Sequence, residues 1–352
     1  MGLINLLRLR RPKGMHIHLR QDDLLKLVVM FSNIYGWVLD IGNLLIPIKS
    51  PEQVRRRREE IEANNISFKF LLSVMLTEDM MPDLLEECHE AGADVLKYQP
   101  FGTTTNSQFG VRLEKLREKY DVLERALELR MIFTGHWELP YNPLTGKDIP
   151  LPLREELSIP YLSDVIDYFP GLTIGVEHIS GRPMLQFVQQ APLNVFGGIT
   201  AHHMGCTRAD MRDQGSFNPH YSCRPVLKDF EDCLALMTAV SAEDNDNLIF
   251  TPDCAPHLKE RKETMSDPPV GIFAPGHIGI PLIIQGLENV GLPIRETALN
   301  NFFSYNAERI YSLPPADDEI VLVREPCIVP AEYNGIVPLW AGRQLNWQMK
   351  EY

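Results

Sequence analysis

Two histidines and an arginine alternate in the stretch MHIHLR, residues 15–20. In an extended strand, side chains alternate between the two faces, so His16, His18 and Arg20 point to the same side. Imidazole is the commonest metal ligand of proteins, and a guanidinium holds a carboxylate through paired hydrogen bonds. The spacing therefore predicts a place where a metal and an anionic group could be bound side by side.

Further potential ligands stand at the ends of short apolar segments that we interpret as strands. At or near the carboxyl-terminal ends of four later segments stand Lys97, His136, His178 and Asp253. The predicted strands cover residues 15–19, 36–43, 68–76, 93–99, 130–136, 172–178, 194–202 and 247–253.

Helical patterns separate most of these strands, and strands that alternate with helices predict a parallel sheet. Eight such units between residues 15 and 253 match a (β/α)8 TIM barrel. A doubly wound open sheet is the competing architecture, although no glycine-rich dinucleotide motif follows any predicted strand. We interpret the charge run of the first helix as a solvated face. The helices cover residues 51–65, 81–92, 113–130, 158–170 and 227–244.

The active sites of TIM barrels lie at the carboxyl-terminal ends of the strands, where ligands distant in the sequence converge. Taken singly, a histidine at a strand end is more often a structural hydrogen-bonding group, and a lysine more often forms a salt bridge. The joint arrangement favours a metal site over these separate interpretations. The six side chains are His16, His18, Lys97, His136, His178 and Asp253.

Composition excludes several classes of partner. The chain has 352 residues, and its 34 basic and 47 acidic residues give a net charge of −13. This acidic balance, without a basic tract, disfavours nucleic acid and anionic membranes. The six cysteines are scattered without a C-x-x-C pair, which predicts free thiols in a reducing compartment. We find neither a signal peptide nor a membrane span, and therefore expect a cytoplasmic protein.

Six motifs resemble those of the class II, single-domain dihydroorotases of the amidohydrolase superfamily. They occur in the right order and at the right separations: MHIHLR, VLKYQPFGTTTNSQFGV, TGHWEL, VEHIS, TAHH and PDCAPH. TAHH and GIFAPGHIGIPL are most similar to fungal-type members. The resemblance runs from RRPKGMHIHLR to GIVPLWAGRQLNW. It implies one metal-dependent hydrolase domain over residues 1–352, with a segment of about 325–352 packed on the barrel.

The resemblance implies two zinc ions in each subunit. His16, His18 and Asp253 would bind the more buried ion, and His136 and His178 would bind the second. The sixth position, Lys97, would be carboxylated on its amine and would bridge both ions. The implied reaction is the reversible cyclisation of N-carbamoyl-L-aspartate to L-dihydroorotate in pyrimidine biosynthesis, with Asp253 as general acid and base.

The same resemblance implies how the small-molecule substrate is bound. Arg20, Asn43 and His257 would share its carboxylate, and backbone groups of Arg224 and Val270 would contact the edge of the pyrimidine ring.

A polar loop that carries Thr104 and Thr105 would close over the substrate. His203 would lie outside the first metal shell. We interpret His89 as a surface residue, His220 and His277 as structural residues, and Cys254 as an inert buried cysteine rather than an oxidation-sensitive thiol. The resemblance also implies, weakly, a homodimer.

The chain departs from the family pattern next to the second strand. Gly42 stands where the family usually has proline, and we expect this change to loosen the backbone that aims Asn43. Asp40 introduces a carboxylate where the strand is normally apolar.

Other departures flank the implied ligands. Trp137 replaces a glycine after His136, Pro252 replaces serine or threonine before Asp253, and Cys254 follows it. These changes bear on rate and substrate preference because the surroundings of a ligand tune its metal. Two alternative functions therefore stay open: another cyclic-amide hydrolase, such as one for a hydantoin-like ring, and a catalytically silent homologue that acts as a binding subunit.

Overall fold

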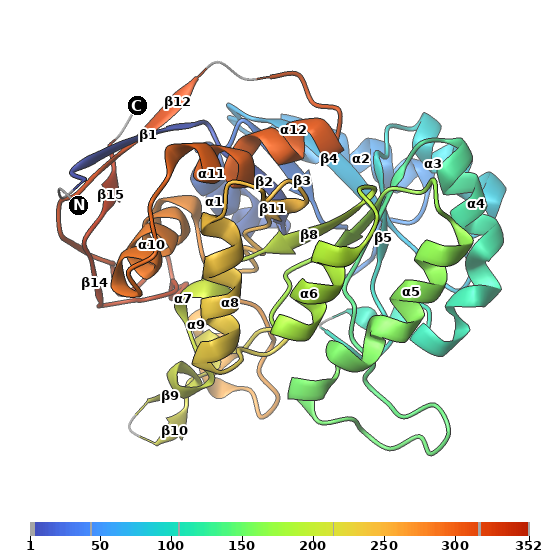
Figure 1. Ribbon diagram of the computed structural model, residues 1–352. Coiled ribbons are helices and arrows are strands. Elements are labelled where there is room, and N and C mark those ends of the chain that lie inside the picture. Colours follow the sequence, from blue (N-terminus) through green and yellow to red (C-terminus); the bar gives the residue numbers. More distant parts are fainter. Residues whose placement is uncertain (1–3, 43, 105, 214, 316–317, 351–352) are drawn as a thin grey trace.

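Eight parallel strands form the central sheet of the computed structural model, which describes residues 4–42, 44–104, 106–213, 215–315 and 318–350. Their order in the sheet is β11-β8-β7-β6-β5-β4-β3-β2. All eight predicted strands are confirmed: the first is shifted by two residues toward the amino terminus, and the other seven are shorter than predicted (Figure 1). They are β2 (Lys13–Ile17), β3 (Trp37–Asp40), β4 (Lys69–Met75), β5 (Val95–Tyr98), β6 (Ile132–Gly135), β7 (Ile174–Val176), β8 (Val195–Ile199) and β11 (Leu248–Phe250).

The sheet closes into a barrel between its first strand and the segment that follows its last. The Asp253 backbone N–H donates to the His16 carbonyl at 2.9 Å, and the His18 N–H donates to the Cys254 carbonyl at 3.1 Å. Ile17 and Cys254 form the parallel bridge between these two hydrogen bonds. The (β/α)8 barrel is thus confirmed, and the open-sheet alternative is wrong.

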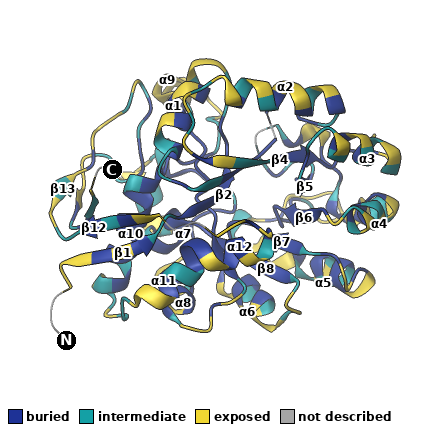
Figure 2. Ribbon diagram, turned by 90° about the horizontal axis from the view of Figure 1, so that it is seen from above, coloured by how far each residue is buried: buried dark blue, intermediate teal, exposed yellow. Residues whose placement is uncertain are grey.

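Helices surround the strands, and Figure 2 shows buried strands at the centre and exposed residues on the outer helix faces. Of the predicted helical segments, 113–130 differs most, because its first turns, Leu113–Lys119, are 3-10 helix. The sequence did not predict α1 or α6. The longer helices are α1 (Asp22–Ser32), α2 (Pro51–Glu62), α3 (Pro82–Glu90), α4 (Tyr120–Glu128), α5 (Ile159–Tyr168), α6 (Arg182–Gln190), α8 (Phe230–Ser241) and α10 (Gly276–Asn289).

Short helices fill connections around the barrel. Among the residues that the structure describes, no helix is long and apolar enough to cross a membrane. The short helices are α7 (Ala201–Gly205), α9 (Lys259–Thr264), α11 (Glu296–Asn300), a π-helix (Asn301–Tyr305) and α12 (Asn306–Ile310).

The two ends of the chain meet in a small antiparallel sheet beside the barrel (Figure 1). Its order is β1-β12-β15, with β1 at Leu6–Arg10, β12 at Glu319–Val323 and β15 at Gln348–Met349. Trp347 is fully buried, and its indole N–H donates to Glu288 of α10 at 2.9 Å. That residues 1–352 form a single domain stays a prediction. The remaining strand pairs are β9 (Arg212–Asp213) with β10 (Ser216–Phe217), and β13 (Cys327–Ile328) with β14 (Gln344–Leu345).

Packed side chains block the amino-terminal end of the barrel. Phe196 from β8 packs in one buried cluster with Tyr311 and Leu313, which follow α12. Beside them, the buried Lys13 ammonium lies 2.8 Å from the Glu308 carboxylate. Access to the barrel is therefore from its carboxyl-terminal end, where TIM barrels carry their active sites.

A buried ion pair ties α2 to the sheet. Ser50 caps this helix by accepting from the Gln53 N–H. Arg57 donates from Nε to one oxygen of Asp40 at 2.7 Å and from Nη2 to the other at 3.2 Å. Both side chains are at most 2% exposed. The interpretation of the whole charge run as a solvated face was therefore wrong for Arg57, because β3 supplies a buried carboxylate for it to bind.

We expect Arg57→Met to lower the free energy of unfolding by about 3–5 kcal/mol, because it leaves the Asp40 carboxylate buried without its counter-charge. Urea unfolding followed by circular dichroism would measure the change. Arg56→Met is the matched control, since Arg56 lies next to it on α2 but is 79% exposed, and we expect a change within about 0.5 kcal/mol. Equal effects of the two substitutions would contradict the assigned role of the ion pair.

Candidate metal centre and active site

The hydrogen bonds that close the barrel also assemble the first group of predicted ligands. His16 in β2 and His18 just after it direct their rings to the same place, and Asp253 faces them from the segment that follows β11. The two imidazole Nε2 atoms are 3.3 Å apart. Each of them is also 3.3 Å from Oδ1 of Asp253.

This triangle has the dimensions of a metal site. Bonds of about 2.0–2.1 Å in a tetrahedral zinc site place neighbouring ligand atoms about 3.3–3.4 Å apart. Burial lowers the pKa values of His16 and His18, so both rings are neutral and carry a lone pair. Burial alone would raise the pKa of Asp253, but the nearby His16 and His18 hold it well below its usual range. The three residues therefore fit a divalent cation.

A second pair of ligands adjoins this triangle. His136 at the end of β6 and His178 just after β7 approach each other, with Nδ1 of the first 3.1 Å from Nε2 of the second. The rings of His16 and His178 have centroids 5.1 Å apart. Potential ligand atoms of His16, His178 and Asp253 all lie within 4.8 Å of one another. The two groups of potential ligands therefore adjoin each other.

Lys97 lies between these ligands at the end of β5. It is fully buried, and its ammonium contacts the carboxylate of Glu177. Burial lowers the pKa of Lys97 to about 7, and the nearby charge of Asp253 opposes part of this shift. Near neutral pH the amine therefore has a substantial uncharged fraction, which is the form that can react with carbon dioxide.

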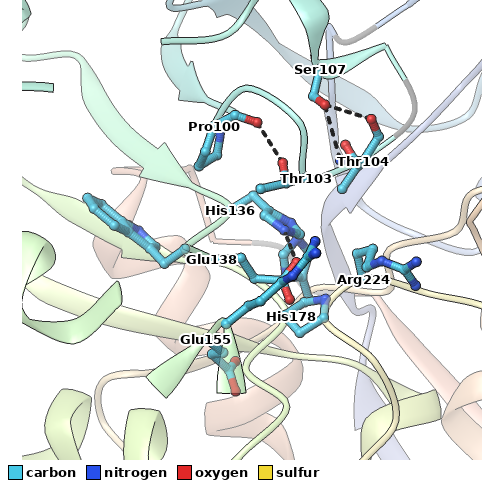
Figure 3. Close-up of polar contacts among 12 residues, drawn as sticks. Pro100, Thr103, Thr104, Ser107, His136, Glu138, Glu155, His178 and Arg224 are labelled. Atoms are coloured by element: carbon cyan, nitrogen blue, oxygen red, sulfur yellow. Dashed lines mark hydrogen bonds and ion pairs between the residues drawn. The ribbon is translucent and has the colours of Figure 1, made fainter. Parts of the chain in front are cut away.

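Two carboxylates that were not among the predicted site residues support the ligands. Glu138 is fully buried and accepts from Nε2–H of His136 at 2.6 Å, which leaves Nδ1 free for a metal (Figure 3). An oxygen of Glu177 lies 3.3 Å from Nδ1 of His16. Both glutamates are near neighbours of a ligand in the motifs TGHWEL and VEHIS, so the common pairing of metal-binding histidine with carboxylate could have identified them.

The backbone is left-handed at three of the predicted site residues. Positive φ angles occur at Arg20 (61°), His178 (41°) and Asp253 (44°). Such conformations are costly for residues other than glycine and persist where the surrounding structure imposes them, often at functional sites. At Asp253 the constraint is the hydrogen bond from its own N–H to His16.

The metal ligands open onto a cleft at the carboxyl-terminal end of the barrel. Arg20, Thr104 and Val270 line it, together with Arg224 and Gln99. Of the predicted substrate-binding residues, Asn43 and Thr105 lie outside the described residues.

His257 positions the guanidinium of Arg20. Its Nε2 is 3.1 Å from Nη2 of Arg20 and 3.0 Å from the carbonyl of Val270, and Nε of Arg20 donates to the Pro256 carbonyl at 3.0 Å. Burial and the charge of Arg20 lower the pKa of His257 to about 2. The ring is therefore neutral, and the site keeps the positive charge of Arg20 for an anionic ligand.

The loop with Thr104 folds over the cleft. Thr103 donates from its hydroxyl to the Pro100 carbonyl at 2.7 Å, and Ser107 donates to the Thr104 carbonyl at 2.7 Å (Figure 3). Gln99, which lines the cleft, donates to the Thr104 hydroxyl. The loop is thus attached to the end of β5, beside Lys97.

Two departures from the family pattern have structural explanations. The Gly42 N–H donates to the Ser73 hydroxyl at 2.9 Å, and a Cβ at Gly42 would lie 2.6 Å from the Ser73 carbonyl oxygen. Packing against β4 therefore requires glycine at this position, and the effect on the aim of Asn43 stays a prediction because Asn43 lies outside the described residues. Trp137 is buried against Tyr98 and Phe133, and its indole donates to the Gly175 carbonyl at 3.2 Å.

No family model matches this chain. A curated relative named dihydroorotase, from Shewanella sp. (strain ANA-3), is 34% identical over 98% of this chain and 99% of its own length. A solved dihydroorotase from Campylobacter jejuni is 25% identical, with a TM-score of 0.85 over 100% of this chain and 99% of its own. A dihydroorotase from Saccharomyces cerevisiae, solved with 5-fluoroorotic acid, shares the fold with a TM-score of 0.89 and 24% identity over 99% of each chain.

We expect Glu138→Gln to weaken metal binding about 10- to 100-fold, because it removes the negative charge that makes His136 a better ligand. Competition with a chelator would give the affinity. Glu156→Gln is the control, since this glutamate is exposed. Unchanged affinity in Glu138→Gln, with the fold intact by circular dichroism, would exclude a supporting role for this carboxylate.

Proposed function

This chain is a member of the dihydroorotase family, and on that premise we propose that it interconverts N-carbamoyl-L-aspartate and L-dihydroorotate with two zinc ions. The observation that carries the proposal is the convergence, at the open end of the barrel, of four histidines, a lysine and an aspartate beside an arginine. A homodimer and a cytoplasmic location stay predictions.

The ligand set divides into two groups that a buried lysine could join. His16, His18 and Asp253 would hold one zinc ion, and His136 and His178 the other. We propose that the Lys97 amine adds carbon dioxide and releases a proton, since the resulting carbamate would offer anionic oxygen atoms to both groups. When bound, the two ions supply an activated water and polarise the ring carbonyl.

The chain itself orients the substrate. Arg20 would hold the carboxylate of the substrate through its guanidinium, which His257 and the Pro256 carbonyl keep in place. Backbone groups of Arg224 and Val270, which line the cleft, would contact the ring edge. The loop with Thr104 would cover the bound substrate and exclude bulk water.

Asp253 would move the proton. Its low pKa provides the carboxylate form, which accepts a proton from the attacking water during ring opening. The same proton then passes to the ring nitrogen as its bond to the carbonyl carbon breaks. In the biosynthetic direction, Asp253 would take the proton from the ureido nitrogen as the ring closes.

The positive charge of Arg20 favours this substrate over the alternative cyclic amides. Hydantoin-like rings that lack a carboxylate would leave the guanidinium without an anionic partner. The silent-homologue alternative has less support, because all six implied ligand positions are present and converge.

We expect zinc-loaded protein to turn over L-dihydroorotate, and a chelator to abolish the activity. Dihydrouracil lacks the carboxylate, so its kcat/KM should be roughly 10- to 100-fold lower than that of L-dihydroorotate. This factor corresponds to the loss of a hydrogen bond to a charged group. Loss of ring absorbance in the ultraviolet measures both reactions. In Arg20→Met this preference should disappear while zinc content stays unchanged. A preference for dihydrouracil in the wild type would support the alternative hydrolase.

We expect Lys97→Ala to abolish turnover and to lower the zinc content, because the two ligand groups lose the group that joins them. Metal analysis and the same absorbance assay measure the two effects. Lys26→Ala is the control, since this lysine is 73% exposed on α1. Wild-type turnover in Lys97→Ala would exclude a bridging role for this lysine.

A further inference from the structure

A second cluster of potential metal ligands lies outside the site described above. His202 and His203 belong to the short helix α7 that follows β8, and Cys223 lies in a loop farther along the chain. All three side chains are at most 1% exposed. Ligand atoms of the three residues lie within 4.8 Å of one another. The sequence analysis placed His203 outside the first metal shell, and the proposed reaction uses none of the three side chains.

His202 is the first sign of a missing ligand. Among the residues that the structure describes, neither of its ring nitrogens has a hydrogen-bond partner. An unsatisfied buried polar atom costs about 1–3 kcal/mol, and such atoms are rare in native proteins. The ring is wholly buried and lies beside His203, with centroids 4.5 Å apart. A cation in the cluster would satisfy one of these nitrogens.

The other two ligands have the spacing that a metal needs. Sγ of Cys223 lies 3.8 Å from Nε2 of His203. Zinc bonds of about 2.3 Å to sulfur and 2.0–2.1 Å to nitrogen place these atoms about 3.5–3.6 Å apart in a tetrahedral site. The Pro225 carbonyl oxygen lies 2.9 Å from the same nitrogen and 3.1 Å from the sulfur. It stands where it could serve as a fourth ligand.

Thr200 provides a partner for the opposite nitrogen of His203. Its hydroxyl oxygen lies 2.9 Å from Nδ1 of His203 and caps α7 by accepting from the His203 backbone N–H at 3.0 Å. A ring with its proton on Nδ1 would donate to this oxygen. Without a cation, Nε2–H of His203 donates to the Pro225 carbonyl at 2.9 Å. With its proton on Nδ1 instead, the ring would offer the Nε2 lone pair to a cation, which is the arrangement common in metal-binding histidines.

We propose that His202, His203 and Cys223 bind one thiophilic cation, Zn²⁺ or Cu⁺, at a third metal site distinct from the two-metal centre. Two imidazoles and a thiolate suit both ions. Burial raises the pKa of the Cys223 thiol to about 12, so the thiol carries its proton when no cation is bound. Binding of the cation would replace this proton, which is released to solvent.

The third site would have a structural role. Arg224, the residue after Cys223, lines the substrate cleft. Once bound, the cation would link α7 to the loop whose backbone at Arg224 is proposed to contact the ring. The role is to position that loop, and the cation takes no part in the reaction.

Cobalt substitution tests the proposal directly. A sulfur-to-cobalt charge-transfer band in the near ultraviolet appears only when a thiolate binds Co²⁺. The proposed ligands of the two-metal centre are nitrogen and oxygen atoms, so Co²⁺ bound there would not produce this band. We expect this band in the Co²⁺-loaded wild type and its loss in Cys223→Ser. Cys254→Ser is the matched control, because Cys254 is buried beside Asp253 and is the other thiol that could reach a metal. The control should keep the band.

Metal analysis of the purified proteins gives an independent count. Wild type should carry one zinc or copper ion more per chain than Cys223→Ser, and the element in excess identifies the native cation. His202→Gln should lose the same ion, while both variants keep dihydroorotase activity within a few-fold. A wild type without the cobalt band, a band retained in Cys223→Ser, or equal metal contents would each overturn the third site. None of these outcomes bears on the two-metal centre, which the turnover assay tests separately.

Discussion

The barrel-closing hydrogen bonds between β2 and the segment after β11 are the constraint on which the site depends. They join Asp253 to His16 and His18 to Cys254, and so bring the first strand beside the last. Because side chains on paired parallel strands project together, this pairing sets the 3.3 Å triangle of two imidazoles and a carboxylate. The left-handed backbone at Asp253 is the local cost of the closure.

Burial then sets the protonation of the groups that closure brings together. The pKa values of His16, His18 and His178 are lowered and their rings are neutral, Lys97 has a lowered pKa, and Asp253 stays ionised among the histidines. The glutamates at 138 and 177 supply fixed negative charge around them. Buried carboxylates supply negative charge, and neutral imidazoles close to them supply lone pairs. Together these groups can bind cations, which is the physical basis of the proposed two-zinc site.

Local patterns predicted much of this arrangement. The alternation of short apolar segments with helices gave all eight strands, and the residues at their ends included the six that converge. The failures share one cause, which is contact between distant segments. Arg57 looked like part of a solvated helix face, but Asp40 of β3 buries it. The need for glycine at position 42 has the same cause, because β4 packs too closely for any other residue.

The sequence by itself determined which chemical groups stand at the strand ends, because strand periodicity and chain order are local properties. It also carries enough motif similarity to indicate the family. Only the tertiary structure decided which nitrogen of His136 faces a metal, which carboxylates support the ligands, and that His202, His203 and Cys223 form a second cluster. Those features depend on burial and on distances between residues far apart in the chain, and these exist only once the barrel has closed.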